Sequence, residues 1–114
     1  MSHADFLVVL ITAPTVADAR RIARVLIEER LAACVNVLPE CRSVYRWDDG
    51  VVEEAEAMMI AKTARDLFPE LARRVTEVHP YAVPEVVGLP VIKVTDPYRR
   101  FLSDSVGREG RDPR

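Results

Sequence analysis

The 114-residue sequence lacks the local patterns that mark many binding and catalytic sites. It has only four glycines and no glycine-rich loop, which counts against a backbone cradle for nucleotide phosphates. It also shows no nucleophile elbow, no repeated set of metal ligands and no cofactor fingerprint. We therefore expect that the protein is not an enzyme.

The sequence also lacks a strong excess of one charge and any long apolar run. The 16 basic and 18 acidic residues are interspersed, so no basic stripe of the kind that binds nucleic acid is present. The first apolar run, Phe6 to Ile11, is too short to span a bilayer and has neither the basic flank nor the cleavage site of a signal peptide. We expect a cytoplasmic protein that contacts neither membrane nor nucleic acid.

The two cysteines, Cys34 and Cys41, match no zinc signature, and a disulfide is not expected in a reducing compartment. Both fall in one predicted strand, where an odd separation places them on opposite faces unless a bulge at Pro39 intervenes. We interpret Cys34 as a core residue, whereas the environment of Cys41 stays open. Met58 and Met59 are adjacent on a predicted strand, so they cannot chelate one soft metal ion together.

What is present is an ordinary globular composition, 49% hydrophobic and 30% charged. Residues 1–106 are expected to form one domain whose core is large enough to need no disulfide or metal ion for its stability. From Ser103 the chain becomes polar, and residues 107–114 are expected to be a disordered tail.

Hydrophobic patterning predicts an alternation of strands and helices. The first half of the chain predicts a buried strand over Phe6–Ala13 and then a helix that is capped by Thr15 and Asp18 and ends near Arg30 and Leu31. A hairpin follows, with arms Ala33–Trp47 and Val51–Thr63 around the turn Asp48-Asp49-Gly50. The second half predicts a helix capped by Asp66, a strand over Val86–Val94 and a short helix capped by Asp96 before Pro97; the buried stripe of the first of these helices is Phe68, Leu71, Val75 and Val78.

This order, βαββαβ, predicts an α+β fold, the ferredoxin-like split β-α-β sandwich, with a long hairpin and a short C-terminal helix. A sheet order of 4-1-3-2 places the second and fourth strands at the edges. Those strands carry Pro39 and Pro90, which an edge strand can accommodate.

The predicted hairpin is too long for its own domain. Arms of about a dozen residues span roughly 40 Å at ~3.3 Å per residue, whereas a sphere with the radius of gyration expected for this length is roughly 34 Å across. The tip carries apolar Val44, Tyr45, Trp47, Val51 and Val52. We expect it to pack on another subunit, the alternative being a bent hairpin that folds back on its own domain.

Residues 77–85 form the most informative loop. Pro80 and Pro84 restrict the backbone around His79, Tyr81 and Glu85, and a stiff polar loop between two core elements is a common place for a site. The alternative is a simple turn. Lys62 follows an apolar strand, so its ammonium group should reach an opening or a carboxylate, such as Glu85 or Glu54.

A set of side chains offers aromatic surface, one cation and one anion, a mixture that suits a polar pocket at subunit boundaries for a small anionic or aromatic metabolite: Tyr45, Trp47, Lys62, His79, Tyr81 and Glu85.

Five spaced blocks of this sequence resemble the CutA divalent-cation tolerance proteins over roughly residues 6–102. The blocks are Leu10 to Pro14, Glu29 to Asn36, Ser43 to Trp47, Lys62-Thr63 and His79 to Glu85. The resemblance implies a ferredoxin-like subunit, a homotrimer with exchanged hairpins, a cytoplasmic location and a link to metal tolerance. It also implies copper binding and a trimer like that of the PII signalling proteins.

Family members proposed to bind copper have a cysteine before the Thr-Ala-Pro block and two adjacent histidines before Pro-Tyr. Here these positions hold Ile11, Val78 and His79. A site for Cu²⁺ or another divalent cation would therefore centre on His79, with help from Glu85, Cys41 or the His79 side chains of other subunits. Such an ion would not be required for folding.

Three functional hypotheses follow. The first is a trimeric protein of divalent-cation (copper) tolerance that binds metal weakly at an inter-subunit cleft. The second is a PII-like sensor or scaffold that binds a metabolite in that cleft. The third, a hydrolase or isomerase that uses His79 and Glu85 as acid and base, ranks last.

Overall fold

The computed structural model describes residues 5–107 as one four-stranded sheet with helices packed on it. The elements in chain order are β1 (Phe6–Ala13), α1 (Val16–Glu28), β2 (Cys34–Trp47), β3 (Gly50–Ala64), the 3-10 turn η2 (Arg65–Leu67), α2 (Phe68–Val78), β4 (Val86–Pro90) and α3 (Asp96–Ser105). The sheet order is β2-β3-β1-β4, and every neighbouring pair is antiparallel. The predicted ferredoxin-like topology is confirmed, and Pro39 and Pro90 lie on the two edge strands as expected.

The helix starts are partly as predicted. The Thr15 hydroxyl accepts a hydrogen bond from the Asp18 amide at 3.0 Å, which is the expected cap of α1. The caps predicted at Asp66 and Asp96 are wrong. Asp66 lies inside η2, and Asp96 is the first residue of α3 after Thr95.

Strand β4 is shorter than the predicted strand over residues 86–94. It ends at Pro90, whose nitrogen has no hydrogen to donate to the sheet. Gly107 lies within the described part of the chain, and its amide donates to the Arg30 carbonyl at 2.9 Å. The rest of the predicted tail, residues 108–114, lies outside the described residues.

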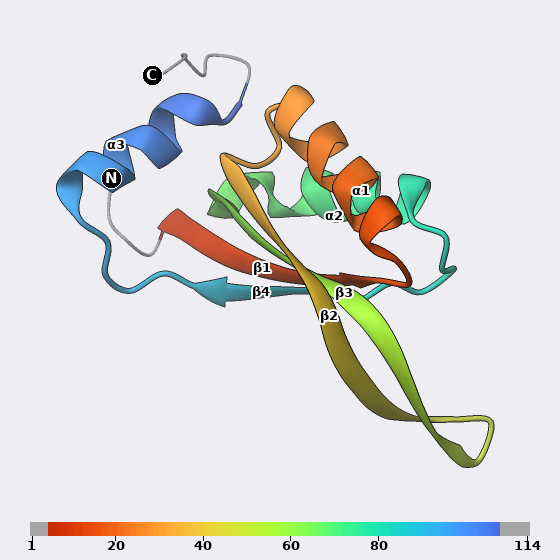
Figure 1. Ribbon diagram of the computed structural model, residues 1–114. Helices are drawn as coiled ribbons and strands as arrows, with labels where there is room; N and C mark the ends of the chain where they lie inside the picture. Colours follow the sequence, from red (N-terminus) through yellow and green to blue (C-terminus); the bar gives the residue numbers. More distant parts are fainter. Residues whose placement is uncertain (1–4, 108–114) are drawn as a thin grey trace.

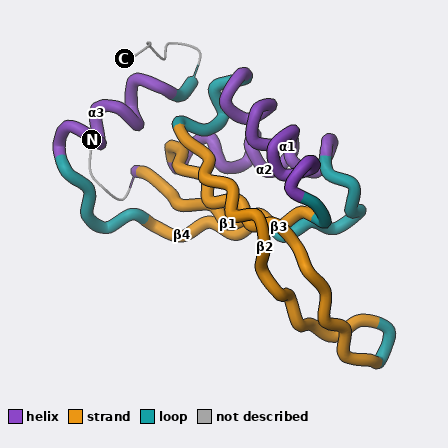
Figure 2. Tube along the Cα trace, in the orientation of Figure 1, coloured by secondary structure: helices purple, strands orange, loops and turns teal. Residues whose placement is uncertain are grey.

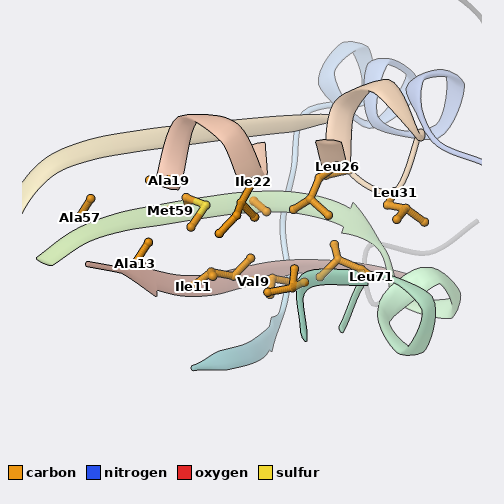
Figure 3. Packing of buried hydrophobic residues seen from close by; sticks show 13 residues of the cluster. Val9, Ile11, Ala13, Ala19, Ile22, Leu26, Leu31, Ala57, Met59 and Leu71 are labelled. Atoms are coloured by element: carbon orange, nitrogen blue, oxygen red, sulfur yellow. The ribbon is translucent and has the colours of Figure 1, made fainter. Parts of the chain in front are cut away.

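The hydrophobic core lies between the sheet and α1 and α2, which cover the same face of the sheet (Figure 1). Alternate residues of β1 and β3 point into it, among them Val9, Ile11 and Met59, each fully buried. Ile22 and Leu26 of α1 and Leu71 of α2 meet them (Figure 3). Two helical stripes thus close one face of the sheet, and the predicted stripe of α2 is confirmed at Leu71 and Val75.

The other face of the sheet is left open by α1 and α2. Leu38, Val87 and Leu89 lie on this face. Leu38 pairs with a residue of β3 that points away from the core, and Val87 and Leu89 pair with residues of β1 that do the same. Their exposed fractions are 42%, 46% and 46%. An apolar sheet face of this kind is a surface suited to another protein chain.

The hairpin of β2 and β3 extends well beyond the rest of the fold (Figures 1 and 2). Strand β1 pairs with β3 only from Ala57 to Ala64, so residues 50–56 pair with β2 alone. The molecule measures 45 × 26 × 23 Å in consequence. The predicted overshoot is confirmed, and the hairpin does not fold back on its own domain.

Two backbone irregularities shape this hairpin. Asp48 and Asp49 form the turn with φ angles of 49° and 61°, as a type I′ turn requires, so Gly50 begins β3 rather than occupying the centre of the turn as expected. The register of β2 shifts between Leu38 and Cys41, around Pro39. Because of this bulge, Cys34 and Cys41 pair with β3 residues of the same face, Lys62 and Glu56, and both are half-buried free thiols. The interpretation of Cys34 as a core residue is wrong, because this face is the one that α1 and α2 leave open.

Candidate ligand groove

His79 anchors the loop that leads from α2 to β4. Its ring is buried, with 8% of the residue exposed. The Nε2 atom lies 2.7 Å from the Thr12 carbonyl oxygen, and the Nδ1 atom accepts a hydrogen bond from the Tyr81 amide at 3.0 Å. A carbonyl can only accept, so Nε2 carries the proton and the imidazole is neutral. Both ring nitrogens are therefore used to hold the loop against β1.

Tyr81 connects this loop to the base of the hairpin. Its hydroxyl donates to the Glu56 Oε2 atom at 3.0 Å, and Glu56 is itself buried, with 7% of the residue exposed. Burial raises the pKa of the Tyr81 phenol well above its usual range, and the hydrogen bond to Glu56 raises it further. The phenol thus stays protonated and remains a donor to the buried carboxylate.

Tyr45 makes a second pair of the same kind. Its hydroxyl donates to the Glu54 carboxylate, and this hydrogen bond, followed by burial, raises the pKa of the Tyr45 phenol. The bulge in β2 makes the pair possible, because it places Ser43 and Tyr45 on the same face of the hairpin as Glu54 and Glu56.

The two tyrosine–glutamate pairs lie in a groove of about 720 Å³ between the hairpin and the loop. Its lining consists of Thr12, Ser43, Val44, Tyr45, Trp47, Glu54, Glu56, Tyr81, Ala82, Val83 and Glu85. Three of these side chains are carboxylates and three are aromatic, and none is Lys, Arg or His. The groove is therefore an acidic site with aromatic walls.

Four of the residues predicted for the cleft line this groove: Tyr45, Trp47, Tyr81 and Glu85. His79 lies behind the groove as the anchor of the loop. Lys62 is elsewhere, because it is six residues from Glu56 along β3, or roughly 20 Å at about 3.3 Å per residue. Its ammonium group donates to the Asn36 Oδ1 atom of the same subunit, so the alternative of a bridge to Glu85 or Glu54 of that subunit is wrong.

Sequence reasoning missed the importance of Glu56. One signal was available, since a glutamate that directly precedes the apolar run Ala57–Ala61 needs a partner if it is buried. The identity of that partner, Tyr81, depends on how the loop folds across the end of β1.

The geometry around His79 does not favour a metal ion bound to this histidine. Both of its nitrogens are occupied, while Ile11 is fully buried and Val78 packs against the core. Within residues 5–107, no group of three or more His, Cys, Asp or Glu side chains is placed to hold an ion. Metal binding at His79 stays a prediction.

Comparison with known proteins gives a consistent result. The family model described as CutA1 divalent ion tolerance protein matches residues 7–105. The Divalent-cation tolerance protein CutA of Thermus thermophilus is 48% identical over 100 residues, covering 88% of this chain and 97% of that protein. Protein CutA of mouse is 41% identical over 88% of this chain, which spans only 58% of the mouse protein.

Solved structures agree with the fold. The Cut A1 divalent cation tolerance protein from Thermus thermophilus superposes with a TM-score of 0.87 at 47% identity, covering 90% of this chain and 99% of that one. CutA1 from Oryza sativa gives a TM-score of 0.88 at 38% identity, covering 90% and 94%. In the described residues, no helix is long and apolar enough to cross a membrane.

Proposed function

Because the chain belongs to the CutA1 divalent ion tolerance family, we propose that it is a trimeric, cytoplasmic protein of divalent-cation tolerance that binds metal ions weakly at a cleft between subunits. The observation that carries the functional class is the family match over residues 7–105. The family is described by the tolerance of ions and not by a reaction, which supports a role without catalysis.

The homotrimer is supported by two surfaces of this subunit. Within residues 5–107, no further strand pairs with the outer hairpin, residues 41–56, and its apolar Val44, Trp47 and Val51 are 62%, 62% and 71% exposed. The open sheet face adds Leu38, Val87 and Leu89. Burying both surfaces against other copies of the chain would remove a large apolar area from water. Static light scattering should give a mass near three times the 12.8 kDa of one chain.

We propose that the metal ion binds one carboxylate of the groove and further donors from a second subunit. No three acidic side chains of the described residues are placed to hold one ion together, so Glu56 or Glu85 would supply oxygen ligands and another chain the rest, and Cu²⁺ accepts both oxygen and nitrogen ligands. His79 would contribute only if its ring left Thr12 or Tyr81. Weak binding follows, because Glu56 and His79 must each give up an existing hydrogen bond and the remaining donors must come from another chain.

A calorimetric titration tests the metal proposal. Wild-type protein, Glu56→Gln and His79→Ala are titrated with Cu²⁺ and Zn²⁺ near neutral pH in a non-chelating buffer. Glu53→Gln is the control, since Glu53 lies on the same strand but pairs with Arg42 outside the groove. We expect saturable binding of at most one ion per subunit that is weakened by Glu56→Gln and unchanged by the control.

The outcomes separate three cases. Loss of binding in His79→Ala alone would assign the ion to the imidazole, and one ion per three subunits would place it on a symmetry axis. Absence of saturable binding would overturn direct binding as the basis of tolerance. Because no ion is expected to be needed for folding, a chelator should leave the melting temperature unchanged.

The proposed cytoplasmic location is consistent with Cys34 and Cys41, which are both free thiols. Cell fractionation followed by immunoblotting tests it. A PII-like role with an anionic metabolite is not favoured, because the groove is lined by three carboxylates and by no cationic side chain. An acid–base pair of His79 and Glu85 is not favoured either, since both nitrogens of the imidazole are hydrogen-bonded to the backbone.

A further inference from the structure

The charge of the groove selects the class of ligand it can hold. Glu54, Glu56 and Glu85 supply three carboxylates, and none of the described residues that line the groove is cationic. Glu56 is the most constrained of the three, because it is buried and its Oε2 atom is held by Tyr81. A buried carboxylate is costly unless it is compensated, and a phenol supplies a hydrogen bond but no charge. A positive charge brought by a ligand would compensate it.

The spacing of the carboxylates suits a ligand larger than a single metal ion. Glu54 and Glu56 are two residues apart on one face of β3, so their backbones are separated by roughly 7 Å. Each carboxylate is held by a different tyrosine, Glu54 by Tyr45 and Glu56 by Tyr81. Oxygen ligands of one hard ion must approach it within about 2.6 Å. The described residues contain no cluster of three acidic or metal-ligating side chains that meets this need.

Aromatic walls complete the chemistry. Tyr45, Trp47 and Tyr81 line the same groove as the carboxylates. Aromatic faces attract organic cations, and the attraction grows when the cation is desolvated. The volume of about 720 Å³ is that of a site for a small organic molecule rather than for a single ion.

We propose that the groove between the β2–β3 hairpin and residues 79–85 binds a small organic ammonium ion, such as an aliphatic diamine. Its two charged ends would lie against Glu56 and against Glu54 or Glu85, and its methylene chain would pack on Tyr45, Trp47 and Tyr81. This inference rests on the proposed function in using the same groove, and it adds an organic cation as a second class of ligand there.

The test uses the protein in its native assembly and 1,4-diaminobutane as the probe. Trp47 is the only tryptophan of the sequence and lines the groove, so its fluorescence reports occupancy directly. We expect a saturable change in Trp47 emission and a matching calorimetric isotherm. Two compounds of similar length serve as controls: neutral 1,4-butanediol and anionic succinate should cause no saturable change.

Matched variants locate the binding. Glu56→Gln removes the buried charge, and we expect it to weaken diamine binding at least tenfold. Glu53→Gln makes the same kind of substitution on the same strand, outside the groove, and should change the dissociation constant less than twofold. Should Glu56→Gln fail to fold, Glu85→Gln gives a second test, with an expected loss of at least threefold.

The proposal is overturned by any of three results: no saturable diamine binding up to millimolar concentration, equal binding of butanediol, or equal loss of affinity in Glu53→Gln and in the groove variant. Titrating Cu²⁺ into the same samples distinguishes a failure of the ammonium site from a failure of the metal proposal. A protein that binds copper but no diamine refutes the ammonium site alone, whereas one that binds diamine but no copper refutes the metal proposal alone.

Discussion

At the scale of single residues, His79 shows how a candidate ligand can be a structural residue. Its imidazole joins two backbone groups, the Thr12 carbonyl near the end of β1 and the Tyr81 amide in the loop. It thereby positions Tyr81, whose hydroxyl holds Glu56 at the floor of the groove. The histidine is important to the site without pointing into it.

The first prediction concerns this anchor. His79→Ala should lower the free energy of unfolding by about 1–3 kcal/mol, the cost of leaving a buried hydrogen-bonding group without a partner. His79→Gln, whose amide can still donate to Thr12, should lose less. Urea denaturation of both variants measures the difference. Equal stability of wild type and His79→Ala would show that the two hydrogen bonds contribute nothing net.

The second prediction concerns pH. Because the pKa of the Tyr81 phenol is raised by burial and by Glu56, the folded state holds this proton more tightly than the unfolded state, where the pKa is about 10. The stabilising effect is complete below pH ~10 and is lost as the pH rises further. The midpoint of urea unfolding should therefore fall above pH ~10, and less steeply in Tyr81→Phe. If the unfolding midpoints of the wild type and of Tyr81→Phe fell equally with pH, the loss of stability would not come from the Tyr81 phenol.

At the scale of elements, the packing of β4 depends on a close approach that only glycine allows without adjustment. A Cβ atom placed on Gly88 would lie 3.2 Å from atoms of both Leu7 and Phe68. Strand β4 is short and sits at the sheet edge, and it begins directly after the loop that lines the groove. The fit of Phe68 over Gly88 therefore helps to set where residues 79–85 lie.

The third prediction follows from this contact. Gly88→Val should destabilise the fold by about 1–3 kcal/mol, the usual cost of overpacking a filled site. Gly50→Val is the matched control, because a Cβ atom there would meet only the Trp47 carbonyl oxygen, at 3.7 Å. Thermal unfolding of the two variants compares them. A control as damaging as Gly88→Val would show that the cost lies in the backbone and not in the contact with Phe68.

At the scale of the whole molecule, the subunit presents two incomplete surfaces, the projecting hairpin and the sheet face that α1 and α2 leave open. The projecting hairpin and the open sheet face are both apolar, and both are continuous with the groove through β3. In a trimer these surfaces would bring a second chain to the groove, so assembly and ligand binding would be linked.

The fourth prediction tests assembly. The melting temperature of the wild type should rise with protein concentration, because association stabilises the folded state. Leu89→Glu, which places a charge on the open sheet face, should lower the mass measured by light scattering. Ile27→Glu is the control, since Ile27 is exposed to a similar degree, 41% against 46%, but lies on α1. Equal effects of both variants would argue against a specific interface at the sheet.

The sequence by itself determined the elements, their order and the sheet topology. Hydrophobic periods of two and of about 3.6 residues are local properties of the sequence. Pro39 and Pro90 exclude the strands that carry them from the centre of the sheet. The same local information predicted the long hairpin, and together with the family resemblance it pointed to four of the groove residues, Tyr45, Trp47, Tyr81 and Glu85.

Only the tertiary structure decided which side chains meet. Lys62 shares a strand with Glu56, yet the rise of an extended chain carries it away from the groove. Glu56 joins the site because the loop after α2 crosses the end of β1, and Tyr45 joins it because the bulge near Pro39 shifts the register of β2. Such contacts depend on strand register and loop path across distant segments, which no local pattern of residues encodes.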